Sequence, residues 1–226
     1  MTVTSTAAET AAMNWRVLGM EDVEAIYRLH IAATDAVGRP DFIRPETLEF
    51  FVKMLSGAGI IVGVHDLHGL LAYGVLQWDL SIEEDPRPAL QLTEADSLAK
   101  LAGASVRPGT WGSGLHRRMI DWRREEARAR GFRHLYATSA PGNERSWTNL
   151  IEEGLQIRSI RQQYGGHLRY VMATDLEDTR PWSCQVSWCD VKDIAGQNTM
   201  LAQGLVGFAW ENREGRRMIC YGQRQP

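Results

Sequence analysis

Two glycines spaced for anion binding stand near the middle of the chain, in the segment Trp111-Gly112-Ser113-Gly114-Leu115-His116. A strand-like pattern precedes them, and the pattern that follows is helical, with Leu115, Met119 and Trp122 on one face. Glycine lets the backbone approach a ligand closely, and the first turn of a helix has N–H groups without an intrahelical partner. A strand, a glycine turn and a helix N-terminus in this order therefore predict an anion site of the kind that holds pyrophosphate.

The spacing excludes two common phosphate loops. The dinucleotide fingerprint requires a third glycine where Arg117 stands, and the Lys-Ser/Thr pair of a P-loop is missing. The pattern that remains is Val106-Arg107-Pro108, followed after a short gap by the glycine segment. It resembles the acyl-CoA site of the GNAT superfamily of N-acyltransferases.

A second motif of the same family follows about thirty residues later. Asn143 stands after the next expected strand, Ser146 lies within the helix that follows, and Gly154-Leu155 ends that helix at the family spacing. The chain departs from the family pattern at Trp111, where glutamine or arginine is usual, and at His116, where a small residue is usual. Two motifs in the right order make the resemblance more specific than either motif alone.

The resemblance implies how an acyl-CoA would be held. The backbone of Val106 would pair with the pantetheine arm, the N–H of Ala104 would face the acyl carbonyl, and the loop N–H groups would hold the pyrophosphate. Asn143 would form a hydrogen bond with the pantetheine, and its alternative role is to cap the next helix together with Ser146. Arg117 would contact a phosphate, and its alternative is a place on a solvated helix face. The candidate cofactor-binding residues are Val106, Trp111, Gly112, Ser113, Gly114, Leu115, His116, Arg117, Asn143 and Ser146.

Transfer of an acyl group from CoA to an amine also needs a base for the amine proton and an acid for the leaving thiolate, and the residues for these two roles are less evident. Leu150 stands where many family members have the tyrosine that protonates the leaving thiolate, and leucine cannot do so. Tyr164, beside the Gly165-Gly166 turn, is a candidate replacement, with a packed or exposed loop tyrosine as the alternative. Asp96 and Glu94 are candidate bases acting through a water, with solvated loop carboxylates as the alternative.

Composition restricts the other possibilities. The chain has 226 residues, is 44% hydrophobic and carries a formal net charge of −3, so it lacks the basic balance of a nucleic-acid binder. No apolar run approaches the roughly 20 residues of a membrane span. Three cysteines occur late in the chain without the spacing of a zinc site. We therefore expect a cytoplasmic protein without a metal, and with no nucleic-acid or membrane partner.

The order of expected elements supports the family resemblance. Residues 1–12 are small and polar, lack the features of a signal peptide and are expected to be a disordered tail. Residues 13–176 follow the GNAT order of strand, two helices, three strands, helix, strand, helix and two strands. This order implies a mixed α/β fold with a largely antiparallel central sheet flanked by helices. Residues 177–226 are expected to form an extension with a helix and a hairpin, and no internal repeat is apparent.

These observations lead to an N-acyltransferase hypothesis, most simply with acetyl-CoA as donor and a primary amine of a small molecule or peptide as acceptor. The acidic segment at 79–96 favours a cationic acceptor, whereas Arg169 in the last hairpin favours an acceptor carboxylate. A GNAT-like module that binds acyl-CoA or nothing, without transfer, is one alternative, and an acyltransferase that uses an acyl carrier protein is another. Acyl length and oligomeric state, including a homodimer, stay open.

Overall fold

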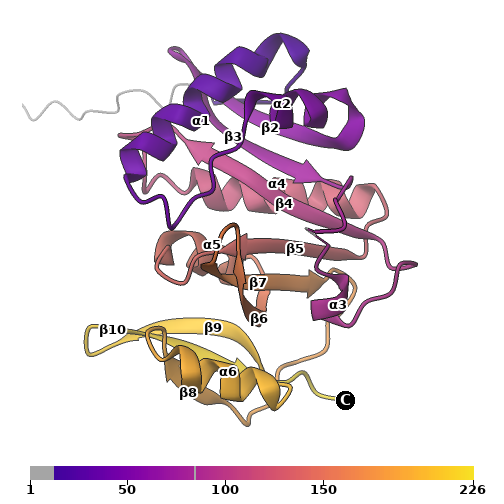
Figure 1. Cartoon of the computed structure of the whole chain (residues 1–226), viewed down its shortest axis with the longest axis vertical. Helices are drawn as coiled ribbons and strands as arrows, with labels where there is room; N and C mark the ends of the chain where they lie inside the picture. Colours follow the sequence, from indigo (N-terminus) through magenta and orange to yellow (C-terminus); the bar gives the residue numbers. More distant parts are fainter. Residues whose placement is uncertain (1–12, 84) are drawn as a thin grey trace, which may run out of the picture.

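A computed structural model describes residues 13–83 and 85–226, so the tail expected at 1–12 lies outside the described residues. The strands of this part of the chain form a single sheet in the order β1-β2-β3-β4-β5-β7-β6-β9-β10-β8 (Figure 1). Neighbours are antiparallel except β4 and β5, which are parallel. The strands are β1 Asn14–Val17, β2 Gly59–Asp66, β3 Gly69–Gln77, β4 Leu98–Val106, β5 His134–Ser139, β6 Gln156–Gln163, β7 His167–Asp175, β8 Ser187–Asp190, β9 Val206–Arg213 and β10 Arg216–Gly222. The mixed, largely antiparallel sheet expected from the sequence is confirmed.

Helices cover both faces of this sheet because β3 carries apolar residues on both sides. Tyr73 and Val75 pack with residues of α1 and α2, whereas Ala72 and Leu76 belong to clusters that contain residues of α4. Alternate residues of a strand point to opposite faces, so α1 and α2 lie on one face and α4 on the other. The helices are α1 Val23–Val37, α2 Leu48–Lys53, α3 Arg87–Leu90, α4 Leu115–Ala129, α5 Glu144–Glu152 and α6 Ile194–Ala202.

Strands β4 and β5 separate partway along their length. Their parallel pairing runs from Leu98 with His134 to Lys100 with Tyr136 and stops there. Strand β4 nevertheless continues to pair with β3 as far as Val106, with an irregularity between Gly74 and Leu76. Residues 101–106 thus have a strand neighbour on one side only, and a gap opens beside them.

The acidic segment at 79–96 differs from the expectation of an irregular, solvated run. It contains the short helix α3, and several of its carboxylates are used locally. Asp79 pairs with Lys53 at 2.9 Å, Asp85 pairs with Arg87 at 2.7 Å, and Asp96 accepts hydrogen bonds from the backbone and hydroxyl of Thr93. The local excess of negative charge read from the sequence is therefore partly neutralised.

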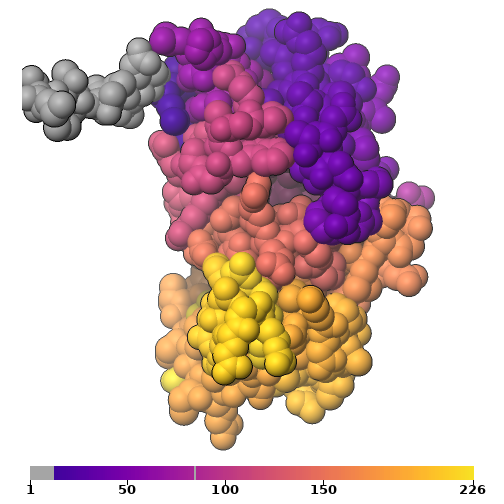
Figure 2. All heavy atoms as spheres, turned by 90° about the vertical axis from the view of Figure 1, so that its left-hand side faces the viewer, coloured from indigo at the N-terminus to yellow at the C-terminus, as the bar shows by residue number. Residues whose placement is uncertain are grey.

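The C-terminal extension continues the sheet. Strand β9 lies antiparallel to β6, with Ile157 opposite Gly207, and β10 and β8 follow outward. The space-filling view shows this part, in orange and yellow, at the opposite end of the molecule from α1 and α2 (Figure 2). Strand β8, which has four residues, was not predicted from the sequence.

The extension repeats the architecture of the segment before it. We call β5, α5, β6 and β7 the first unit and β8, α6, β9 and β10 the second unit. Helix α6 and strand β9 begin and end 50 residues after α5 and β6, respectively. Both hairpin turns contain a non-glycine residue with positive φ, Tyr164 at 52° and Glu214 at 49°. The expectation of no internal repeat is therefore wrong at the level of structure.

The two units share one hydrophobic core. Residues from both belong to the same buried cluster, including Trp147 of α5 and Ile219 of β10. At its centre the side chain of Gln197 accepts hydrogen bonds from the hydroxyls of Tyr170 and Tyr221, each at 2.9 Å. All three side chains are completely buried. This junction ties the second unit to β7 of the first.

Candidate active site

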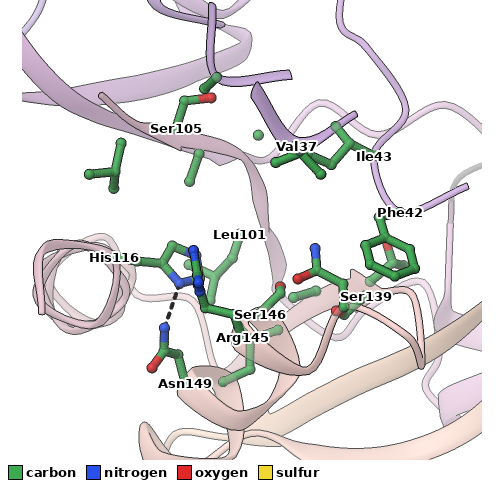
Figure 3. Close-up of a pocket in the computed structure, with 18 of the residues that line it drawn as sticks. Val37, Phe42, Ile43, Leu101, Ser105, His116, Ser139, Arg145, Ser146 and Asn149 are labelled. Carbon is green, nitrogen blue, oxygen red and sulfur yellow. Dashed lines mark hydrogen bonds between the residues drawn. The ribbon is translucent and has the colours of Figure 1, made fainter. Parts of the chain in front are cut away.

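A cavity of about 750 Å³ occupies the gap between β4 and β5. The glycine loop and the start of α4 close one side of it, and the segment that joins α1 to α2 closes the other. Figure 3 shows Phe42 and Ile43 across the cavity from His116 and Asn149, with Leu101 and Ser139 between them. The cavity therefore connects the two faces of the sheet through the separated strands.

The glycine loop has the geometry that was inferred from its sequence. Gly112 and Gly114 have φ values of 90° and 77°, in the left-handed region that favours glycine. Gly114 precedes α4 and offers no side-chain cap. Within the described residues, the backbone N–H groups of 112–117 donate to no protein acceptor. Such a run of free donors at a helix N-terminus suits an anion.

Trp111 folds back over the end of β4. Its indole Nε1 donates to the backbone carbonyl of Val106 at 2.9 Å. The guanidinium of Arg145, from the first turn of α5, lies 5.2 Å from the centre of the indole ring. Trp111 and Arg145 thus connect the glycine loop to α5 at one side of the cavity, and this contact places a cation beside the loop.

His116 makes a second link between α4 and α5. The amide nitrogen of Asn149 lies 2.9 Å from Nδ1 of His116 (Figure 3). Burial, with a smaller contribution from the charge of Arg123, lowers the pKa of His116 to about 4. The imidazole is therefore neutral near pH 7, as expected from its position at a helix N-terminus, and with Nδ1 as acceptor it carries its proton on Nε2.

Asn143 lines the cavity and does not cap its helix. It stands at the N-cap position of α5, but its side chain makes no capping hydrogen bond. Ser146 also lines the cavity, and only its backbone N–H bonds to the carbonyl of Asn143, at 3.0 Å. The amide group of Asn143 is consequently available to a ligand.

Two arginines near the loop are directed elsewhere. Arg117 pairs with Glu152 and Glu153 at the end of α5 and does not line the cavity. Arg107 forms a bidentate pair with Asp66, at 2.8 and 3.2 Å. Both guanidinium groups have carboxylate partners, and for this reason we leave Arg117 out of the candidate site.

The remaining candidate residues of the loop and of β4 also border the cavity. Ala104 and Val106, together with Ser113 and Leu115, line the cavity. The backbone of β4 from residue 101 onward has no β5 partner, so its groups on that side are open to a ligand that lies between the strands.

Beneath β4, the side chain of Arg123 is almost completely buried and also borders the cavity. It donates to the carbonyls of Met119, Val75 and, at 3.4 Å, Ala102. Burial lowers the pKa of Arg123 to about 9, which leaves the guanidinium charged at pH 7. The bonds to Val75 and Ala102 supply donors to backbone carbonyls near the irregularity between β3 and β4.

Tyr164 borders the cavity on the side of the α1–α2 segment. Its hydroxyl lies 3.5 Å from Oγ1 of Thr138 on β5. The guanidinium groups of Arg44 and Arg169 lie 5.0 and 5.6 Å from the centre of its ring. The two candidate bases Asp96 and Glu94 do not line the cavity, since Asp96 faces its own loop through Thr93.

Several polar residues of the cavity were missed in the sequence, among them His30, Glu46 and Lys100. Nε2 of His30 accepts from the backbone N–H of Glu46 at 2.9 Å, and Nδ1 lies 2.8 Å from the hydroxyl of Tyr73. Burial lowers the pKa of His30. The side chain of Glu46 packs against Gly103, next to Ala104 on β4. His30 looked like one residue of an amphipathic helix, and Glu46 like the residue after a helix-starting proline, so neither gave a signal.

The chain was compared with known proteins. No family model and no curated protein matches it. Solved structures with the same fold include the ribosomal-protein-S18-alanine N-acetyltransferase of Escherichia coli, with a TM-score of 0.56, 16% identity and coverage of 74% of this chain and 96% of that one. A putative acetyltransferase of Salmonella typhimurium, solved with acetyl-CoA, has a TM-score of 0.57 and 17% identity, and the match covers 76% of this chain and 99% of that one. A putative phosphinothricin N-acetyltransferase has a TM-score of 0.56 and 16% identity, with coverage of 74% of this chain and 100% of that one. The chain therefore has the fold of the GNAT N-acetyltransferases.

Proposed function

We propose that the protein is an N-acyltransferase that moves an acyl group, most simply acetyl, from acyl-CoA to a primary amine. One observation carries this proposal: the gap between β4 and β5 leads to a glycine loop whose N–H groups have no acceptor among the residues that the structure describes. The shared fold supports it, as does the acetyl-CoA present in one of the similar structures. No helix in the described part of the chain is long and apolar enough to cross a membrane.

The cavity suits an acyl-CoA. The N–H groups from Gly112 to His116 would hold the pyrophosphate, and Ser113 would add its hydroxyl. The exposed backbone of Val106 and the amide of Asn143 would hold the pantetheine between the strands. The N–H of Ala104 would donate to the thioester oxygen as negative charge develops on it, the role of an oxyanion hole. Trp111 would share or release the Val106 carbonyl when the cleft is filled.

The acceptor amine would enter from the side of Tyr164. Its nitrogen bonds to the acyl carbon, the carbon–sulfur bond breaks, and the electron pair leaves with the thiolate. Glu46, whose N–H donates to His30 of α1 and whose side chain packs against Gly103 of β4, would take the proton that the amine loses. Tyr164 would supply a proton to the thiolate, since Leu150 cannot. A thiol of pKa roughly 8.5 is a fair leaving group, so the acid is the less critical of the two.

The test is release of free CoA from acetyl-CoA by the purified protein in the presence of a panel of primary amines. We expect amine-dependent release that Glu46→Gln lowers at least about 30-fold in kcat and Tyr164→Phe lowers about 3- to 10-fold, with an unchanged Kd for acetyl-CoA. Binding of acetyl-CoA without transfer to any amine would contradict the proposed activity and favour a protein that binds acyl-CoA without catalysis. Absence of binding would redirect the search to carrier-protein donors or an inactive scaffold.

A further inference from the structure

The cationic side chains that line the cavity lie in more than one part of it, including one part near the glycine loop and another near Tyr164. Among the described lining residues are five cationic side chains, Arg44, Lys100, Arg123, Arg145 and Arg169, against the two carboxylates Glu46 and Glu144. This positive balance contrasts with the formal net charge of −3 of the chain. Arg145 lies beside the glycine loop, where phosphates would bind, whereas Arg44 and Arg169 both lie near the Tyr164 ring. Phosphate binding at the glycine loop therefore does not account for Arg44 and Arg169.

Arg169 is the more informative of these two arginines. Its exposed fraction is only 3%. Nη1 donates to the carbonyls of Asp41 and Leu168, at 2.8 and 2.9 Å. Its Nε and Nη2 have no acceptor among the described residues, and the carboxylate of Asp41 is itself paired with Arg39. Arg169 lines the cavity, so these two unused donor groups are open to a ligand that can accept hydrogen bonds from them.

The donors of a guanidinium match a carboxylate, which can accept two parallel hydrogen bonds from it. Arg169 projects from β7 and Arg44 from the α1–α2 segment, so both border the side by which the acceptor would enter. Glu46, the proposed base, lines the same cavity. One acceptor that carries an amine and a carboxylate on the same carbon would satisfy both residues, with its carboxylate at Arg169 and its amine toward Glu46 and the thioester.

We infer that the acceptor is a free amino acid or a small amino-carboxylate of the same pattern, with Arg169 as the residue that selects the carboxylate. This inference rests on the proposed function. It replaces the cationic acceptor suggested by the acidic segment, because no described residue of that segment lines the cavity, and Asp79, Asp85 and Asp96 are engaged within or next to the segment. It also favours a small molecule over a peptide N-terminus, whose α-carboxyl group is lost in the peptide bond.

The experiment compares matched acceptor pairs, each an amino acid and its carboxamide, in the CoA-release assay with saturating acetyl-CoA. We expect the wild type to use the acid with at least about 10-fold higher kcat/KM than the amide, after correction for the fraction of unprotonated amine. Arg169→Gln should remove this preference, lowering kcat/KM for the acid at least about 30-fold and for the amide less than about threefold. Arg169→Lys should retain part of the preference, and Arg216→Gln on β10 is the matched control.

The ratio of kcat/KM for the acid to kcat/KM for its carboxamide distinguishes a role of Arg169 in carboxylate recognition from a purely structural role. A loosened α1–α2 segment would lower kcat/KM for both members of a pair alike. Equal use of both members by the wild type, or an unchanged ratio in Arg169→Gln, would overturn the inference and leave the proposed function standing. Failure to bind acetyl-CoA, measured by calorimetry in the same preparation, would instead overturn the proposed function, and the inference with it.

Discussion

The first and second units have the same order of elements, yet only the first borders the cavity. Both consist of a strand, a nine-residue helix and a hairpin, and in both a glycine with positive φ follows the helix, Gly154 in one and Gly204 in the other. The strand of the first unit, β5, has β4 as a parallel neighbour, whereas β8 of the second lies at the edge of the sheet. A site thus requires the neighbouring strand and glycine loop in addition to the unit itself.

The residues at the N-cap positions of α5 and α6 also differ in whether they serve the cavity or the helix. Asp193 accepts a hydrogen bond from the N–H of Gly196 at 2.8 Å and caps α6. Asn143, at the equivalent position 50 residues earlier, makes no capping bond and lines the cavity. The second unit uses this position for stability, and the first leaves it available for a ligand.

The largest effect is expected at the glycine loop. Gly112→Asp places a side chain and a like charge where the pyrophosphate would lie, and should weaken acetyl-CoA binding at least about 100-fold. Gly215→Asp, in the hairpin of the second unit, introduces comparable backbone strain at a φ of 77° and should leave affinity unchanged. Calorimetry on the two variants checks this. Equal affinities would remove the loop from the site.

A large effect on stability is expected where the two units meet. Gln197→Leu removes the acceptor of two buried tyrosine hydroxyls and should lower the free energy of unfolding by about 2–4 kcal/mol. The Kd for acetyl-CoA should stay within about twofold, because Gln197 is not a cavity residue. Urea unfolding followed by fluorescence gives the first value. A loss below 0.5 kcal/mol, by rough expectation for surface sites, would mean that the units are not coupled through this residue.

A pH-dependent effect is expected at His116, the link between α4 and the first unit. Its folded pKa of about 4 lies below the usual value near 6.5, so the unfolded chain binds the proton more readily. Stability contributed by the neutral imidazole is complete above pH 6.5 and falls as the pH drops toward 4, by about 1–3 kcal/mol. His116→Gln should show a shallower decline over this range in thermal unfolding. Parallel curves for the two proteins would refute the assignment.

The smallest effects test the two equivalent positions before the helices. Asp193→Ala should lower the free energy of unfolding by about 1 kcal/mol, the usual value of a helix cap, without changing acetyl-CoA affinity. Asn143→Ala should do the reverse, with little loss of stability and a roughly 5- to 20-fold weaker affinity. If Asn143→Ala were as destabilising as Asp193→Ala and bound acetyl-CoA normally, Asn143 would be a structural residue.

The sequence was sufficient to predict the fold and the loop side of the cavity because both depend on local patterns. Period and turn residues located the strands and helices of 14–175 with the exception of the short helix α3, and two glycines located the start of α4. The sequence could not show that Arg117 would pair with Glu152 and Glu153, because those partners lie 35 and 36 residues away. Glu46 gave no signal either, since its place against Gly103 depends on how the α1–α2 segment folds over β4.

The repeated unit escaped sequence reading for a related reason. Equivalent positions in the two units are mostly different residues, such as Trp147 and Gln197, both completely buried. Backbone geometry is retained because it depends on a few positions, among them Gly154 and Gly204 after the helices and Gly165 and Gly215 in the turns. A few glycines at a constant spacing are too weak a pattern to establish a repeat without the strand pairing.

The most direct test of the central claim is hydrogen–deuterium exchange of the protein with and without saturating acetyl-CoA. We predict slower exchange in β4, the glycine loop, the start of α4 and the segment around Asn143, with no change across residues 187–222 of the second unit. Protection confined to the second unit, or its absence from the glycine loop while acetyl-CoA is bound, would contradict the assignment of the site to the gap between β4 and β5.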